Sequence, residues 1–149
     1  MRDALVPVLL AALVLACLTT GAGGAFAQTA PALAAAGTDA AQVSAFLKSL
    51  QAAISLGNRT KVAALVHYPL TVWMDGAETT VRNDSEFQAR YSRIFDADLK
   101  KAIAEASVDS LAADAQGIVL GGGRIRVRPV AEHRNAVKIV AINNAAQPR

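Results

Sequence analysis

Cysteine and aromatic residues are scarce in this chain of 149 residues. Cys17 is the only cysteine, and aromatic residues make up 5% of the sequence. A chain with one cysteine forms no internal disulfide, and beyond position 17 it has no thiol nucleophile and no thiolate to hold a metal. Packing of apolar side chains must therefore stabilise the fold, and the residues beyond position 27 suffice for one domain with a single core.

Histidine is equally rare, since His67 and His133 are the only two. Two distant histidines without cysteine show no metal-ligand spacing, and the triplet Gly121–Gly123 lacks the lysine of a phosphate-binding loop. We therefore expect no metal site and no cofactor.

The first 27 residues have the pattern of a bacterial export signal. Arg2 precedes the apolar run Ala4–Leu18, and small residues then lead to Ala25-Phe26-Ala27, a small-x-small cleavage site. The run is short for a retained transmembrane helix. We expect cleavage after Ala27 and a periplasmic or secreted protein.

Cys17 gives an alternative, because Val14–Cys17 resembles a lipobox. If Cys17 is lipidated, the domain is anchored to a membrane; otherwise no membrane contact is expected. The sequence then divides into a signal (1–27), a flexible leader of low complexity (28–38), a folded domain (39–143) and a tail (144–149).

The net charge of +3 is unevenly distributed. Residues 28–114 carry eight Lys and Arg against ten Asp and Glu, whereas residues 115–149 carry six against one. A basic end favours an anionic partner. Export and the scarcity of aromatic side chains argue against nucleic acid.

Helical periodicity dominates the first part of the domain. A helix is expected over Ala40–Leu56, with Asp39 as its cap and Gly57 at its end, and a second over Arg59–His67. The apolar stripe of the first helix comprises Val43, Phe46, Leu47, Leu50 and Ile54.

The period then changes to that of a hairpin. Leu70–Met74 and Glu78–Arg82 read as strands around the tight turn Asp75-Gly76. A capping box at Asn83–Glu86 opens a third helix, interrupted at Asp96 and continuing to about Ala106. A meander of three strands follows, expected over Leu111–Leu120, Arg124–Val130 and Ala136–Ile142.

This order predicts an α+β fold, α-α-β-β-α-β-β-β, with N-terminal helices packed on a strongly bent antiparallel sheet. Three segments carry a family resemblance: His67–Leu70, Glu86-Phe87 with Tyr91 and Ile94-Phe95, and Gln116–Gly121 with Gly123. They resemble exported bacterial proteins of the nuclear-transport-factor-2-like, cystatin-like superfamily. The resemblance implies a cone-shaped fold with a cavity between sheet and helices, and no particular reaction. Arg124 and Arg126 depart from the family pattern, which tends to have an acidic residue and an aromatic there.

The expected cavity supplies the candidate ligand site. Trp73, Tyr68 and Tyr91 are amphipathic aromatics that would form its walls or pack at its edge. Gln116 would either point an amide inward or form a bulge with Gly117. His67, near the end of its helix, is the candidate acid or base, but no carboxylate is placed by sequence to orient it.

Arg124, Arg126 and Arg128 share one face of a strand, with Ile125 and Val127 on the other. The arginine face is either solvated or, if concave, an anion site that needs a counter-charge. Asp109 or Asp114 would supply that counter-charge.

The sequence favours a non-catalytic exported domain that binds a small apolar or anionic molecule through the three aromatics, Arg126 and Gln116. Two alternatives stay open. One is an isomerase- or dehydratase-like enzyme that uses His67, and the other is a protein-interaction module, with a homodimer formed through the sheet.

Overall fold

The computed structural model describes residues 32–144. The expected export signal over 1–27, the cleavage site at Ala27 and Cys17 lie outside the described residues, as do residues 145–149. Among the described helices, none is both long and apolar enough to cross a membrane. The elements in chain order are α2 (Ala40–Ser55), α3 (Arg59–Ala64), β1 (Val66–Met74), β2 (Ala77–Val81), α4 (Asp84–Ile94), α5 (Ala97–Glu105), the 3₁₀ turn η1 (Val108–Ser110), β3 (Ala112–Asp114), β4 (Gly117–Leu120), β5 (Ile125–Val130), the 3₁₀ turn η2 (Ala131–His133) and β6 (Ala136–Asn143).

A six-stranded sheet with strand order β2-β1-β6-β5-β4-β3 organises these elements. The fold is therefore α+β, as predicted. The prediction of a purely antiparallel sheet is wrong, because β1 and β6 pair in parallel. Parallel neighbours need a long crossover, and the chain makes it through α4, α5 and the meander before β6 enters beside β1.

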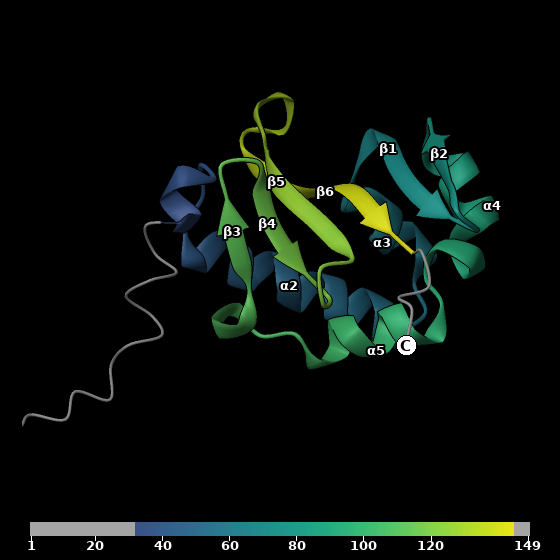
Figure 1. The fold of residues 1–149 in the computed structure, drawn as a ribbon, viewed down its shortest axis with the longest axis horizontal. Coiled ribbons are helices and arrows are strands. Elements are labelled where there is room, and N and C mark those ends of the chain that lie inside the picture. The colour runs from purple at the N-terminus through teal and green to yellow at the C-terminus, as the bar shows by residue number, and fades with distance from the viewer. Residues whose placement is uncertain (1–31, 145–149) are drawn as a thin grey trace, which may run out of the picture.

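Helices cover one face of the sheet. Figure 1 shows α2 behind the strands and α5 along the lower edge, with the other face turned to the viewer. The apolar stripe predicted for α2 is buried there, except that Ile54 is only half-buried. Strand alternation supplies the opposite wall of the core, which includes Leu70, Val72, Ile118, Leu120, Ile125, Val127, Ile139 and Ile142.

Local capping signals are confirmed by their hydrogen bonds. Asp39 Oδ1 accepts from the Gln42 amide at 2.8 Å, and Asn83 Oδ1 accepts from the Glu86 amide at 2.9 Å. Asp75 and Gly76 form the predicted tight turn with φ angles of 53° and 77°. These features depend only on residues a few positions apart, which explains why the sequence predicts them.

Two predicted helix boundaries are wrong. The second helix ends at Ala64 rather than near His67, so His67 lies in β1. The third helix is two helices, since α4 ends at Ile94 and the Asp96 carboxylate accepts from the Leu99 amide at 2.7 Å to start α5. A residue that interrupts the apolar period here begins a new helix.

The predicted strand over Leu111–Leu120 is a hairpin of β3 and β4. Its turn contains Gln116, whose backbone N–H donates to Asp114 Oδ1 at 2.7 Å. The turn ends at Gly117, which has a φ of 134°. A Cβ at Gly117 would lie 2.5 Å from the Val127 carbonyl oxygen, so the hairpin requires glycine there.

The ends of the described chain are held to the domain. Residues 32–35, expected in a flexible leader, form a helical turn whose Leu33 is 1% exposed and joins the core. At the other end, the backbone N–H of Asn144 donates to the Trp73 carbonyl at 2.8 Å. Residues outside the predicted domain limits of 39 and 143 therefore contact the folded domain at both ends, through an apolar side chain at Leu33 and a backbone hydrogen bond at Asn144.

Candidate functional site

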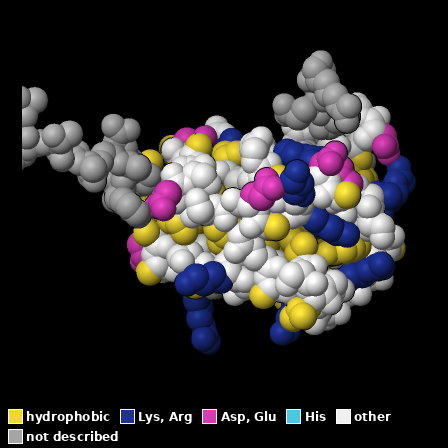
Figure 2. Space-filling view, turned by 90° about the horizontal axis from the view of Figure 1, so that it is seen from below, with side chains coloured by type: hydrophobic (Ala, Val, Ile, Leu, Met, Phe, Trp, Pro, Cys, Tyr) yellow, Lys and Arg dark blue, Asp and Glu magenta, His cyan; other side chains and the backbone are white. Residues whose placement is uncertain are grey.

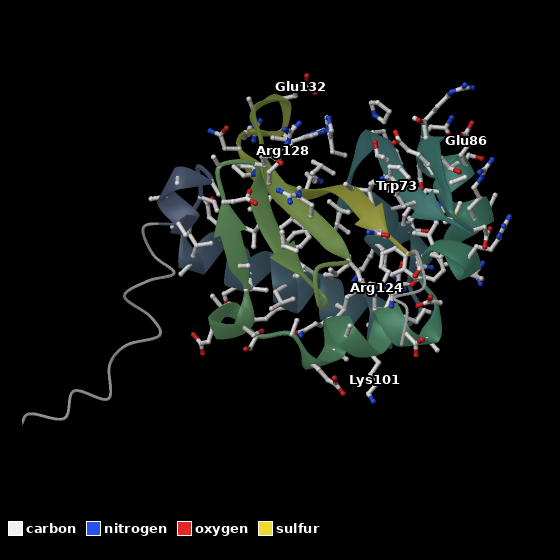
Figure 3. The ribbon with its side chains drawn as sticks, viewed as in Figure 1. Trp73, Glu86, Lys101, Arg124, Arg128 and Glu132 are labelled. Carbon is white, nitrogen blue, oxygen red and sulfur yellow. The ribbon has the colours of Figure 1, made fainter. Side chains whose placement is uncertain are left out.

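The outer face of the sheet, opposite the helices, brings together two of the predicted ligand-binding residues. Sheet register places Thr71 beside Ala141, Ala141 beside Arg126, and Arg126 beside Val119 across β1, β6, β5 and β4. Trp73 lies two residues further along β1. Trp73, Arg124 and Arg128 are labelled along this side of the sheet in Figure 3.

Trp73 and Arg126 border a hollow of about 220 Å³. Ala141 and Val119 also line it, together with Arg124. On β6, which separates β1 from β5, Ala141 is the partner of Arg126 and Asn143 is the partner of Trp73. Because Ala141 is small, it fills little of the space beside the indole and the guanidinium. We refer to this depression as the Trp73–Arg126 hollow.

The indole of Trp73 is 44% exposed, which makes it one of the two large hydrophobic side chains exposed among the described residues. Leu56, at the end of α2, is the other. The sequence places Trp73 at an interior cavity, whereas the structure places it on the uncovered face. Strand alternation explains this, because Val72 and Met74 on either side of it point into the core.

Aspartates pair with two of the three nearby arginines, namely Arg124 just before β5 and Arg126 within β5. Arg126 Nη1 donates to Asp114 Oδ1 at 3.0 Å, so the predicted counter-charge is confirmed. Arg124 Nη2 lies 3.2 Å from Asp96 Oδ2 and also donates to the Asn144 side chain. Arg128 is exposed. The arginines share one face as predicted, and that face is neither fully solvated nor a bare cluster of positive charge.

The environment of Asp96 favours its charged form. Burial raises the pKa of its carboxyl, but the Leu99 amide, the Arg124 guanidinium and the Asn144 side chain outweigh burial, so that the pKa lies below its ordinary value. The Asp96 carboxyl is consequently charged at neutral pH and pairs with Arg124 beside the hollow.

Tyr91 lies in the interior and not at the Trp73–Arg126 hollow. Its ring is 3% exposed and stacks on Phe95 at 5.2 Å, and the Arg59 and Lys100 cations lie 5.3 and 5.5 Å from the ring centre. Its hydroxyl is buried and has no hydrogen-bond partner. Burial raises the pKa of Tyr91, with Arg59 acting in the opposite direction. The residue is a core side chain with cationic neighbours.

Tyr68 and Gln116 also lie apart from the Trp73–Arg126 hollow. Tyr68 packs edge-on against Phe87 and donates to the Ala63 carbonyl at 3.4 Å, and burial followed by the charge of Asp84 raises its pKa. Gln116 is exposed, and neither predicted alternative, an inward amide or a bulge with Gly117, is observed. The residue instead lies in the tight turn between β3 and β4, which Asp114 and Gly117 close as partners.

Core side chains pack between α2 and the sheet, where the resemblance implies a cavity. Phe46 and Leu50 from α2 belong to the same buried cluster as Ile118, Ile125 and Ile139 from the sheet. The Trp73–Arg126 hollow opens instead to the surface. Seen from below, the surface shows Lys and Arg beside Asp and Glu, with hydrophobic side chains between them (Figure 2).

A second hollow, of about 370 Å³, contains both histidines. The rings of His67 and His133 are 6.0 Å apart with an interplanar angle of 78°, and Nδ1 of His67 is buried without a hydrogen-bond partner. Asp84 and Glu132 line the same hollow. Sequence spacing gave no signal for this pair, because β1 and the η2 turn meet only through the parallel pairing of β1 with β6.

Comparison of the chain with models of protein families, with curated proteins and with solved structures finds no match to any of them.

Proposed function

We propose that this protein is a non-catalytic binding domain that holds a small anionic molecule with an apolar ring in the Trp73–Arg126 hollow. The observation that carries the proposal is an exposed indole and a guanidinium that border the same hollow, which the small side chain of Ala141 also lines. An indole face accepts a flat apolar group, and a guanidinium donates paired hydrogen bonds to a carboxylate or phosphate.

The existing ion pair leaves Arg126 able to bind a ligand. Its Nη1 contacts both oxygens of Asp114, at 3.0 and 3.3 Å, and a guanidinium has five N–H donors. The pair is partly exposed, so it contributes little to stability and is exchangeable at low cost. An anionic ligand would therefore share or replace Asp114.

The size of the hollow limits the ligand. Its volume of about 220 Å³ is below the range of roughly 300–1,000 Å³ that is typical of drug-sized sites. A molecule with one ring and one acidic group suits this space.

The proposal also includes export of the protein through a signal over residues 1–27 and membership of the cone-fold family. The sequence pattern of Arg2, Ala4–Leu18 and Ala25-Phe26-Ala27 supports export. Packing of α2 against β6, on the helix-covered side of the sheet, supports the cone fold.

Fluorescence titration tests the binding function directly, because Trp73 is the only tryptophan of the chain. Phenylacetate should change Trp73 emission saturably, and its neutral analogue phenylacetamide should bind about tenfold more weakly, as expected when a charge-assisted hydrogen bond is lost.

Two variants on the same strand face sharpen the test. Arg126→Gln should weaken phenylacetate binding about tenfold. Arg128→Gln, two residues along and outside the hollow, should leave it unchanged. Equal effects of the two variants, or no saturable change in the wild type, would overturn the proposal. Emission that depends on protein concentration and not on phenylacetate would instead indicate pairing of two copies through this face.

A further inference from the structure

We propose that His67 and His133 form a binding site for a divalent transition-metal ion, Zn²⁺ or Cu²⁺, at the junction of β1 and the η2 turn. The site is independent of the Trp73–Arg126 hollow. Both histidines of the chain meet here, although they are far apart in sequence.

The separation of the two rings fits one shared ion. A metal–nitrogen bond is about 2.0–2.1 Å long, so two imidazoles on one ion have ring centres about 5–6.5 Å apart, depending on the bond angle. The observed separation is 6.0 Å, with the rings nearly perpendicular at 78°. Both rings border an open hollow, whereas two rings that only bury apolar surface against each other do not require open space beside them.

His67 also has a ring nitrogen that no protein atom satisfies. Its Nδ1 is buried and lacks a hydrogen-bond partner, although nearly all buried polar atoms have one. Imidazole nitrogen is a preferred ligand of zinc and copper. An ion between the rings would take a nitrogen lone pair from each histidine.

The charges around the hollow suit a cation. Asp84 and Glu132 line it, while Lys138 is the one basic residue along its wall and donates its ammonium to the Ala64 carbonyl. Glu132 immediately precedes His133 at the top of the loop between β5 and β6 (Figure 3). A carboxylate next to one of the two histidines makes the surroundings of the proposed ion more negative.

The backbone holds the two histidines in different ways. Between Val66 and Thr71 the β1 chain advances five residues while β6 advances only from Ile139 to Ala141, so the segment with His67 bulges from the sheet. His133 is in a turn that ends with Arg134 and Asn135 at φ 57° and 60°. Both side chains are therefore displaced from the regular strand faces and meet beside the sheet.

Within residues 32–144, no group of three or more His, Cys, Asp and Glu side chains is placed to hold a metal ion. The proposed site consequently has two protein nitrogens, with water completing the coordination shell. Such a site exchanges its ion readily and leaves positions open to a further ligand.

Isothermal titration of the full chain, without a histidine tag, with Zn²⁺ and separately with Cu²⁺ tests the proposal. We expect one ion per chain. His133→Asn, a change of an exposed side chain, should weaken binding at least about tenfold, because it removes one of two nitrogen ligands. His67→Asn should do the same, and circular dichroism would verify its fold.

Controls separate this site from general surface binding. Glu105→Gln removes an exposed carboxylate of α5, outside the histidine hollow, and should not change the affinity. Glu132→Gln should have an effect smaller than that of either histidine. Zn²⁺ and Cu²⁺ affinities that are equal in wild type and His133→Asn, or the absence of stoichiometric binding in the wild type, would refute the site.

Discussion

Arg124 and Asp96 are 28 residues apart in the chain, and their side chains pair at 3.2 Å. The same carboxylate accepts the Leu99 amide with its other oxygen at 2.7 Å. Asp96 therefore starts α5 and also ties this helix to the residue that precedes β5.

We predict that the two roles of Asp96 separate by mutation. Asp96→Ala removes the helix cap and the ion pair and should lower the free energy of unfolding by about 1–2 kcal/mol. Asp96→Asn retains a capping oxygen and should cost less, since only the charge is lost. Urea unfolding followed by circular dichroism measures both. A larger loss in Asp96→Asn than in Asp96→Ala would contradict the capping role.

The lowered pKa of Asp96 predicts a dependence of stability on pH. A carboxyl group whose pKa is lower in the folded state adds stability above its unfolded-state pKa of about 3.9. This contribution is lost as the pH falls through the lower folded-state value. Between neutral pH and pH 2 the wild type should therefore lose more stability than Asp96→Asn does. Parallel slopes in urea melts of the two proteins would exclude the linkage.

Leu33 provides a test of where the domain begins. Leu33→Ala should cost about 2–5 kcal/mol, because it empties part of the core. Leu56→Ala makes the same chemical change at a side chain that is 74% exposed, and it should alter the free energy of unfolding by less than about 0.5 kcal/mol. Similar costs for the two variants would show that residues 32–38 do not pack as described.

Gly117 should tolerate alanine less well than Gly122. Both have positive φ, 134° and 68°, but a Cβ at Gly117 meets the Val127 carbonyl oxygen at 2.5 Å, whereas a Cβ at Gly122 meets nothing within 4 Å. Gly122→Ala should cost about 1–2 kcal/mol from backbone strain alone. Gly117→Ala should cost at least about 1 kcal/mol more from the steric clash. Thermal melts measure the loss of stability in each variant, and the loss should be larger for Gly117→Ala than for Gly122→Ala.

Export predicts a defined N-terminus. Expressed from Met1 in a Gram-negative host, the chain should appear in the periplasmic fraction with the mass of a protein whose first residue is Gln28. Cys17→Ser should leave that product unchanged. Loss of a membrane-bound form in Cys17→Ser would instead support lipidation at Cys17.

Local chemistry made part of this fold predictable. The caps at Asp39 and Asn83 and the turn at Asp75-Gly76 involve residues within a few positions, and alternation in β5 placed Arg126 and Arg128 on one face. Each of these signals has a short-range physical cause that the sequence displays.

Non-local pairing accounts for what the sequence did not reveal. The parallel pairing of β1 with β6 brings His67 to His133, and side-chain burial puts Tyr91 in the core while Trp73 stays outside. Apolar periodicity says that a side chain lies on a face, but not which layer covers that face. For this reason the sequence does not predict that Trp73 and Arg126 border one hollow on the outer face, since that depends on the register of β1, β6 and β5.

Ala141 has the smallest side chain among the strand residues that line the Trp73–Arg126 hollow. Enlarging this one position would narrow the gap while leaving the indole and the guanidinium in place. A single substitution at this position would therefore change which molecules fit. Two proteins with this fold, the same indole and the same guanidinium could differ in the ligands they accept through the size of this one side chain.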